Sequence, residues 1–133
     1  MILIGLFGGS PESREEITRV ITRTGADVGA YGLSPTMGLS GPDRAEKLAV
    51  VLQGLGAQVK GATLIITHVL SREEADAIRA CGGRLLYVMG EPSDVIPIQQ
   101  EDLPVTAMAG GCKHYLDPLE AYSEILLSLG RVR

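Results

Sequence analysis

Several features are missing from this chain, and each absence excludes a class of protein. There is no tryptophan and a single phenylalanine in 133 residues, so aromatic surfaces on which nucleic-acid bases stack are scarce. The 16 acidic residues outnumber the 12 basic ones, and the net charge of −4 argues against a nucleic-acid binder, which needs a basic face. No apolar run reaches about 18 residues, so we expect no membrane-spanning helix and no membrane partner.

Metal-binding and secretory signals are missing as well. Cys81 and Cys112 form no C-x-x-C pair, which favours two reduced thiols in a cytoplasmic protein. His114 lies two residues from Cys112, but a zinc site needs about four ligands and no others match this spacing. Met1 leads straight into an apolar run, without the basic segment and cleavage site of a signal peptide. We therefore expect no bound metal, and we predict a cytoplasmic location.

What the chain does contain is a regular alternation of apolar strands and amphipathic helices. Strands are predicted at residues 1–7, 28–31, 62–69, 84–89 and 104–108, and helices at 10–23, 42–55, 71–81 and 118–129. This alternation predicts a single α/β domain over residues 1–133, with a doubly wound, mainly parallel sheet of about five strands and helices on both faces. With 45% hydrophobic residues, the chain can bury a core of that size.

Capping residues and apolar spacing predict where the helices begin and which faces they bury. Ser10 before Pro11 is a typical N-cap arrangement, and so is Ser71 with Glu74 three residues later; Ser40 precedes the second helix. Helical spacing places the following residues against the core: Ile17, Val20 and Ile21 in the first helix, Ala45, Leu48, Ala49 and Leu52 in the second, Ala75 and Ile78 in the third, and Leu119, Tyr122, Leu126 and Leu129 in the fourth.

The segment from residue 2 to residue 21 has the order of a phosphate-binding loop: a buried strand, a glycine turn and a helix. In such loops the backbone N–H groups at the start of the helix converge on an anion. The full signature reads G-x-x-x-x-G-K-[ST], and here Gly8 alone matches. Ser13, Arg14 and Glu15 replace the second glycine, the lysine and the hydroxyl residue. The candidate phosphate-binding residues are Gly8, Gly9, Ser10, Ser13 and Arg14.

Each of these residues also has a simpler interpretation, which we favour. Residues 8–10 suit a tight strand-to-helix turn with a serine cap. Arg14 suits a solvated position on the helix surface, and Glu15 suits a surface ion pair with Arg19, four residues later. Three carboxylates near the start of the helix also oppose the binding of a polyphosphate: Glu12, Glu15 and Glu16.

A second segment adds a resemblance to a known family. Residues 64–84 read LIITHVLSREEADAIRACGGR, an apolar strand followed by a helix with Ala-Asp-Ala-Ile-Arg and then Gly-Gly. Together with residues 4–17, this segment resembles the deoxynucleoside monophosphate kinases found mainly in phages, which belong to the P-loop kinases. The resemblance implies a P-loop kinase-like fold in which the strands at Ile4 and Ile65 are adjacent. It also implies ATP and Mg²⁺ as cofactors of an active member.

The chain departs from this family at the positions that carry phosphoryl transfer. Arg14 and Glu15 or Glu16 stand where the family has its lysine and its Mg²⁺-binding hydroxyl. The sequence His68-Val69-Leu70 replaces Asp-Val-Arg, and the segment before the strand at Ile65, which helps to form the lid in such kinases, is short. Because phosphoryl transfer depends on positioning and charge neutralisation, losing these groups removes most of what the protein contributes.

His68 is a further site candidate. It follows a predicted parallel strand, at the edge where open α/β sheets bind ligands, and an imidazole titrates near neutral pH. No nucleophile is visibly paired with it, so the simpler interpretation is a polar residue at the end of a strand.

These observations lead to two alternative functions. We predict a non-catalytic relative of nucleotide kinases, a pseudoenzyme with a degenerate Walker A loop, no catalytic residues and no cofactor. It would act as a binding or interaction protein for a protein partner or a nucleotide-like ligand. The alternative is an active kinase with an altered site, which transfers phosphate from ATP to a (deoxy)nucleoside monophosphate with Mg²⁺.

Overall fold

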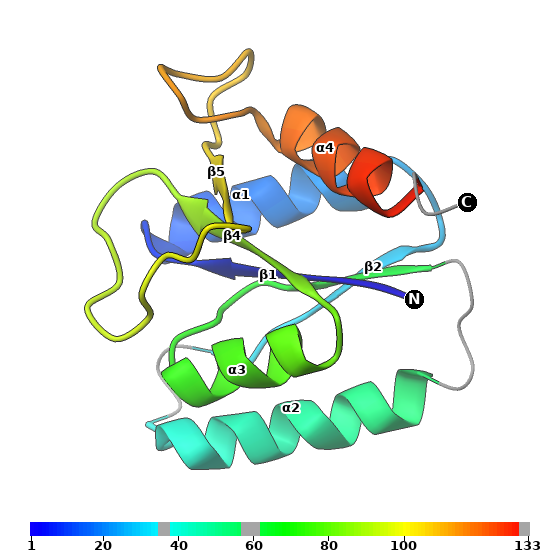
Figure 1. The fold of residues 1–133 in the computed structure, drawn as a ribbon, viewed down its shortest axis with the longest axis vertical. Helices are drawn as coiled ribbons and strands as arrows, with labels where there is room; N and C mark the ends of the chain where they lie inside the picture. The colour runs from blue at the N-terminus through cyan, green and yellow to red at the C-terminus, as the bar shows by residue number, and fades with distance from the viewer. Residues whose placement is uncertain (35–37, 57–61, 131–133) are drawn as a thin grey trace.

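A parallel sheet forms the centre of the computed structural model, which describes residues 1–34, 38–56 and 62–130. Five strands lie in the order β2-β3-β1-β4-β5 (Figure 1), and every pair of neighbours is parallel. Their bounds are Ile2–Phe7 for β1, Val28–Tyr31 for β2, Thr63–Ile66 for β3, Arg84–Val88 for β4 and Leu103–Val105 for β5. The predicted parallel sheet is confirmed.

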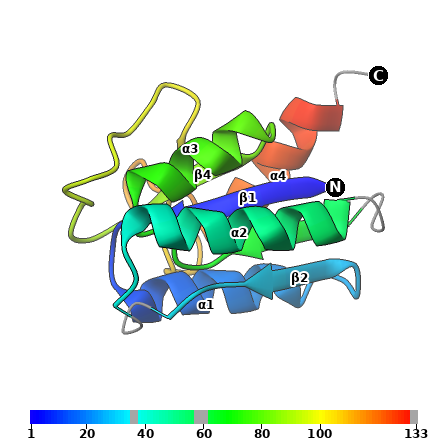
Figure 2. The same cartoon turned by 90° about the horizontal axis from the view of Figure 1, so that it is seen from below.

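Two pairs of helices cover the two faces of this sheet. Helices α1 (Pro11–Thr22) and α4 (Pro118–Gly130) lie on one face, and α2 (Gly41–Gly56) and α3 (Arg72–Ala80) lie on the other (Figure 1). Helices α2 and α3 lie side by side, as the second view in Figure 2 also shows. The fold is therefore a doubly wound α/β fold, as predicted. Among the described helices, none is both long enough and apolar enough to cross a lipid bilayer.

Strand β1 runs through the middle of the core. Leu3 and Phe7 pack with the layer of α2 and α3, while Ile4 and Leu6 pack with the layer of α1 and α4. A strand that is buried on both faces reads as a continuous apolar run, which explains why β1 is easily predicted. Ile4 lies opposite Ile65 of β3, so the predicted adjacency of these two strands is confirmed.

The predicted caps of α1 and α3 are confirmed. The Ser71 hydroxyl accepts a hydrogen bond from Glu74 N, and the Glu74 carboxylate accepts one from Ser71 N, which completes a capping box. The Ser10 hydroxyl accepts from Ser13 N at 3.1 Å, and Pro11 is the first helical residue. These caps fix where each helix begins relative to the end of the strand before it.

Two strands end three residues earlier than predicted. Strand β3 ends at Ile66 instead of Val69, and β5 ends at Val105 instead of Met108. Beyond β5 the chain leaves the ladder, since Thr106 N donates a hydrogen bond to Leu116 O. Val69 stays buried although it lies in a loop, so an apolar run overestimates the length of the strand.

The predicted buried face of α4 is partly wrong, although Tyr122 packs against the core as predicted. Ala121 and Ile125 are fully buried, whereas Leu119 is 48% exposed and Leu126 is 39% exposed. The sequence of α4 carries two apolar stripes at helical spacing, and the stripe with the small Ala121 packs against α1 and the sheet. The prediction for Leu129 lies outside the side chains that the structure describes.

The buried face of α2 is partly different from the prediction. Leu48 and Leu52 are buried as predicted, but Ala49 is exposed and Arg44 lies in the core. Positions 44, 48 and 52 follow one another at intervals of four residues, so they share one face of the helix. The charged side chain of Arg44 therefore needs partners inside the protein.

Candidate functional site

The predicted site residues lie together at the carboxyl edge of the sheet. Gly8 and Gly9 follow β1, His68 follows β3, and these two strands are neighbours. Gly8 and Gly9 have φ angles of +76° and +64°, which glycine adopts without strain, and Ser10 then caps α1. The structure thus brings the glycine turn and His68 into one site, at the edge where open α/β sheets bind ligands.

Arg14 fills the inside of the glycine turn. The residue is 4% exposed, and its Nη1 donates hydrogen bonds to Gly8 O at 2.8 Å and to Gly9 O at 3.3 Å. Its Nε donates to His68 Nδ1 at 3.2 Å. The turn therefore directs two carbonyl oxygens toward a cation of the protein itself, whereas an anion site needs N–H groups in that place.

The interpretation of Arg14 as a solvated helix residue is wrong. The buried positions of α1 are Arg14, Ile17, Thr18 and Ile21, at intervals that place them on one face of the helix. The Thr18 hydroxyl donates to Arg14 O at 2.8 Å and lies 3.1 Å from Thr67 Oγ1. Helical periodicity is thus the signal in the sequence that places Arg14 toward the core.

Backbone N–H groups of the turn have partners within the protein. Gly9 N donates to Glu91 O at 2.8 Å. Ser13 N donates to the Ser10 hydroxyl and Arg14 N donates to Ser10 O, both at 3.1 Å. The Ser10 and Ser13 hydroxyls also lie 3.1 Å apart within this cap. A phosphate would be bound by N–H donors of this kind. Here these three donors are bonded within the protein, as they are at an ordinary capped helix start.

His68 is held between Arg14 and Glu15. The Arg14 Nε–H donates, so His68 Nδ1 accepts and the proton of the neutral ring lies on Nε2. His68 Nε2 lies 3.3 Å from Glu15 Oε2 and donates to that carboxylate. The predicted pair of Glu15 with Arg19 is wrong, because Arg19 pairs with Glu16 instead. With both ring nitrogens engaged, His68 has no free lone pair with which to act as a general base.

The surroundings of His68 favour its neutral form. Burial of the ring lowers the pKa of His68 below its ordinary value, and the positive charges of Arg14 and Arg44 lower it further. Glu15 acts in the opposite direction through its charge and its hydrogen bond, but its side chain is 63% exposed. Protonation would add a third cation beside two arginines and would remove the acceptor of the Arg14 Nε–H.

We expect this imidazole to make the protein less stable in mild acid. The pKa of His68 is lower in the folded protein than in the unfolded chain, so the unfolded chain takes up the proton first. The stabilisation is therefore complete above the unfolded value of 6.5, and it is lost as the pH falls through the lowered pKa. Urea unfolding at about pH 7 and about pH 5 measures this loss.

Two glutamine variants isolate the contribution of His68. In His68→Gln the amide still accepts from Arg14 and donates to Glu15, but it takes up no proton in this pH range. The unfolding free energy of this variant should therefore fall less than that of the wild type between the two pH values. His114→Gln changes an exposed residue and should follow the wild type. Equal losses in all three proteins would contradict this account of His68.

A second buried arginine, Arg44, was missed in the sequence and ties the site to α2 and α3. Its Nε donates to Glu74 Oε1 at 2.9 Å, in an ion pair whose side chains are 5% and 2% exposed. Its Nη2 donates to Leu33 O at 2.9 Å and to His68 O at 3.2 Å. Its Nη1 donates to Ser34 O at 3.3 Å. One side chain thus holds the segments that leave β2 and β3 against two helices.

Glu74 acts both as a helix cap and as the counter-ion of Arg44. Its Oε1 also accepts hydrogen bonds from Leu70 N and Ser71 N at 3.1 Å and from the Ser71 hydroxyl at 3.0 Å. These donors surround a single buried carboxylate oxygen, so the start of α3 and the Arg44 side chain depend on the same group.

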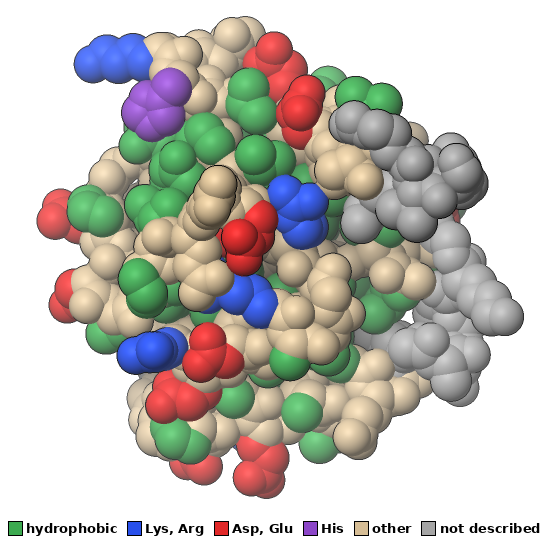
Figure 3. Space-filling model, in the orientation of Figure 1, with side chains coloured by type: hydrophobic (Ala, Val, Ile, Leu, Met, Phe, Trp, Pro, Cys, Tyr) green, Lys and Arg blue, Asp and Glu red, His purple; other side chains and the backbone are tan. Residues whose placement is uncertain are grey.

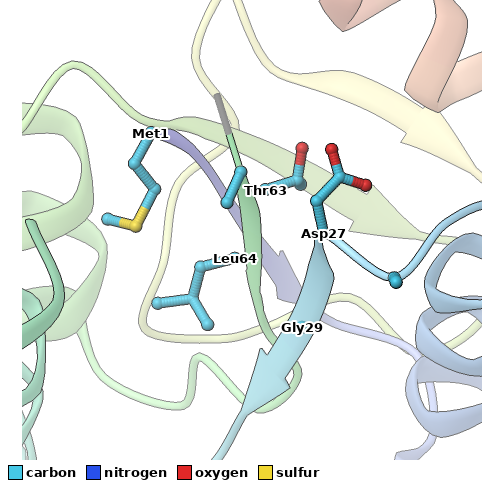
Figure 4. Close-up of a pocket in the computed structure, with 7 residues that line it drawn as sticks. Met1, Asp27, Gly29, Thr63 and Leu64 are labelled. Carbon is cyan, nitrogen blue, oxygen red and sulfur yellow. The ribbon is translucent and has the colours of Figure 1, made fainter. Parts of the chain in front are cut away.

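Open space lies beside the site and at the opposite edge of the sheet. A cavity of about 480 Å³ lies at the first turns of α2 and α3, lined by Gly41, Leu70, Ser71, Arg72, Glu73 and Val95. A cavity of about 240 Å³ opens at the amino edge, where Met1 and Leu64 lie on one side and Asp27 on the other (Figure 4). The Thr63 hydroxyl in its wall is already bonded to Tyr122 at 2.8 Å. Polar groups therefore do not converge on this second cavity as they do around Arg14.

Cys81 and Cys112 do not form part of a metal site among the described residues. Cys81 ends α3, and Cys112 lies in a tight turn in which its N–H and C=O bond to Tyr115. Over residues 1–34, 38–56 and 62–130, no three His, Cys, Asp or Glu side chains are placed to hold a metal ion.

The face of the molecule in Figure 3 mixes acidic, basic and apolar side chains.

Comparison of the chain with protein-family models, with curated proteins and with solved structures found no match. The resemblance to deoxynucleoside monophosphate kinases therefore rests on the two segments of sequence quoted above, and it stays a prediction.

Proposed function

We propose that this chain is a non-catalytic relative of nucleotide kinases in which the phosphate-binding loop serves as a structural turn. It acts as a binding or interaction protein and uses neither ATP nor Mg²⁺. The observation that carries the proposal is the Arg14 guanidinium, which is bonded to Gly8 O and Gly9 O inside the turn. A guanidinium in that place occupies the two carbonyl acceptors of the turn, and the N–H groups of Gly9, Ser13 and Arg14 are already bonded within the protein.

The neighbouring groups support the same proposal. Phosphoryl transfer needs a phosphate-binding cation, a hydroxyl or carboxylate for Mg²⁺, and a group that positions the nucleophile. Here the cation is engaged by the turn, Glu15 is bonded to His68, and both ring nitrogens of His68 are occupied. With the turn closed to phosphates, a partner has to be recognised elsewhere on the surface.

A calorimetric titration with ATP and Mg²⁺ tests the proposal. We expect a dissociation constant weaker than about 1 mM, because three N–H groups of the turn are bonded within the protein and carboxylates lie at the start of α1. A deoxynucleoside monophosphate, titrated in the same way, should bind no better. A dissociation constant in the low micromolar range for either ligand would favour the altered but active kinase.

The variant Glu12→Gln distinguishes two reasons why ATP would not bind: a turn filled by Arg14, or repulsion by the nearby carboxylates. Glu12 is exposed in the first turn of α1, so the variant removes one carboxylate and leaves Arg14 in place. If the filled turn prevents binding, this variant also fails to bind ATP. If the variant gains micromolar affinity, the carboxylates were the obstacle and the turn is competent for phosphate.

A further inference from the structure

The two edges of the sheet are protected in different ways. At the β5 edge, Thr106 N donates to Leu116 O and Leu116 N donates to Pro104 O, so another segment and a proline cover the strand. Strand β2 at the other edge reads VGAY, without a charge or a proline, and no described segment pairs with its outer side. Because proteins usually blunt an open strand edge, this edge is suited to pairing with another strand.

The backbone of β2 has hydrogen-bonding groups on its outer side. Asp27 O accepts from Thr63 N and Tyr31 O accepts from Thr67 N, both toward β3. Successive residues of a strand direct these groups to opposite sides, so Ala30 directs its N–H and C=O away from β3. Among the described residues Ala30 has no hydrogen-bond partner outside the sheet, and it is exposed. The edge therefore presents a donor and an acceptor to an incoming strand.

A groove between β2 and α2 lies beside this edge, and it carries an exposed apolar side chain and two opposite charges. It has a volume of about 450 Å³ and is lined by Tyr31, Leu33, Glu46, Lys47 and Val50. Val50 is 65% exposed, so the groove carries an apolar side chain that a partner can cover. Glu46 and Lys47 lie next to each other, and neither takes part in an ion pair within the described residues.

We propose that the β2 edge and this groove bind a second copy of the chain, with the two β2 strands antiparallel around a two-fold axis. Such an axis joins two sheets into one and sets the groove-lining faces of the two α2 helices opposite each other. Val50 is then covered by the groove of the other copy, and Glu46 faces Lys47 of the partner subunit. A groove lined by one charge of each sign is complementary to itself under a two-fold axis, which favours a second copy over an unrelated strand.

Sedimentation equilibrium of the full chain tests the interface, and its outcome does not depend on whether the glycine turn binds phosphate. The wild type should sediment at twice its mass of 14.1 kDa at about 100 µM. Val50→Glu should weaken dimerisation at least about tenfold, because it buries an unpaired charge. Val95→Glu, at a loop position that is 49% exposed, is the matched control and should dimerise like the wild type.

A charge series then tests the two-fold geometry. Glu46→Lys alone and Lys47→Glu alone each place like charges across the axis and should weaken the dimer, while the double exchange should restore it. A mixture of the two single variants should form heterodimers, since one copy then carries two positive charges and the other two negative charges. Circular dichroism verifies that each variant is folded. A monomeric wild type, or a dimer that is insensitive to Val50→Glu and to the series, would overturn the proposal.

Discussion

Replacing Arg44 with methionine is expected to lower the free energy of unfolding by about 3–5 kcal/mol. The variant leaves Glu74 with 2% of its side chain exposed and without its counter-ion, and a buried charge without a partner is strongly destabilising. It also removes the hydrogen bonds to Leu33 O, Ser34 O and His68 O, which hold the segments after β2 and β3. Urea unfolding followed by circular dichroism measures the change.

Two further variants show whether the buried charge is the cause. Arg19→Met removes an ion pair with Glu16 whose side chains are 54% and 38% exposed, so it should change stability by less than about 0.5 kcal/mol. In Arg44→Met combined with Glu74→Gln, the amide oxygen still accepts from the start of α3 but carries no charge. This double variant should be more stable than Arg44→Met alone. A loss below about 1 kcal/mol in Arg44→Met would contradict the buried ion pair.

Replacing Arg14 with methionine is the second change for which we expect a large effect, a loss of about 2–4 kcal/mol. Gly8 O and Gly9 O lose their donor, and so does His68 Nδ1, while methionine fills part of the space. These acceptors are then left in a partly buried site, which is more costly than losing a solvated hydrogen bond.

Arg23→Met is the matched control for this prediction. Arg23 caps the other end of α1 and is exposed, so its replacement should change stability by less than about 0.5 kcal/mol. Arg14→Lys keeps the charge but lacks the planar fork that reaches both carbonyls and the imidazole, so it should recover only part of the loss. A solvated Arg14 would instead make Arg14→Met and Arg23→Met equally mild.

The fold was open to prediction because its signals are local. Strands buried on both faces read as continuous apolar runs, as in β1, and Ser10 and Ser71 mark the helix starts through their own side chains. The buried face of α4 could not be predicted in full, because its sequence carries two apolar stripes. The choice between them depends on how closely Ala121 lets the helix approach α1, which is a matter of packing.

The position of the site was predictable, but its internal chemistry was not. The glycine turn and His68 follow two strands that the resemblance places side by side, so their meeting was expected. The burial of Arg14 and of Arg44 was missed because a charged residue is assigned to solvent unless its partners are known. One partner of each arginine lies far along the chain: His68 is 54 residues from Arg14, and Glu74 is 30 residues from Arg44. Helical spacing is compatible with the burial of both arginines, but it was not read that way, because only the tertiary structure supplies the groups that make this burial favourable.

An experimental structure from crystals grown with Mg²⁺ and a non-hydrolysable ATP analogue tests the filled turn most directly. We predict that Arg14 Nη1 donates to Gly8 O and Gly9 O, that Nε donates to His68 Nδ1, and that no nucleotide occupies the turn. Phosphate groups bound to the backbone N–H groups of residues 8–14, with the Arg14 side chain turned out of the site, would contradict the account.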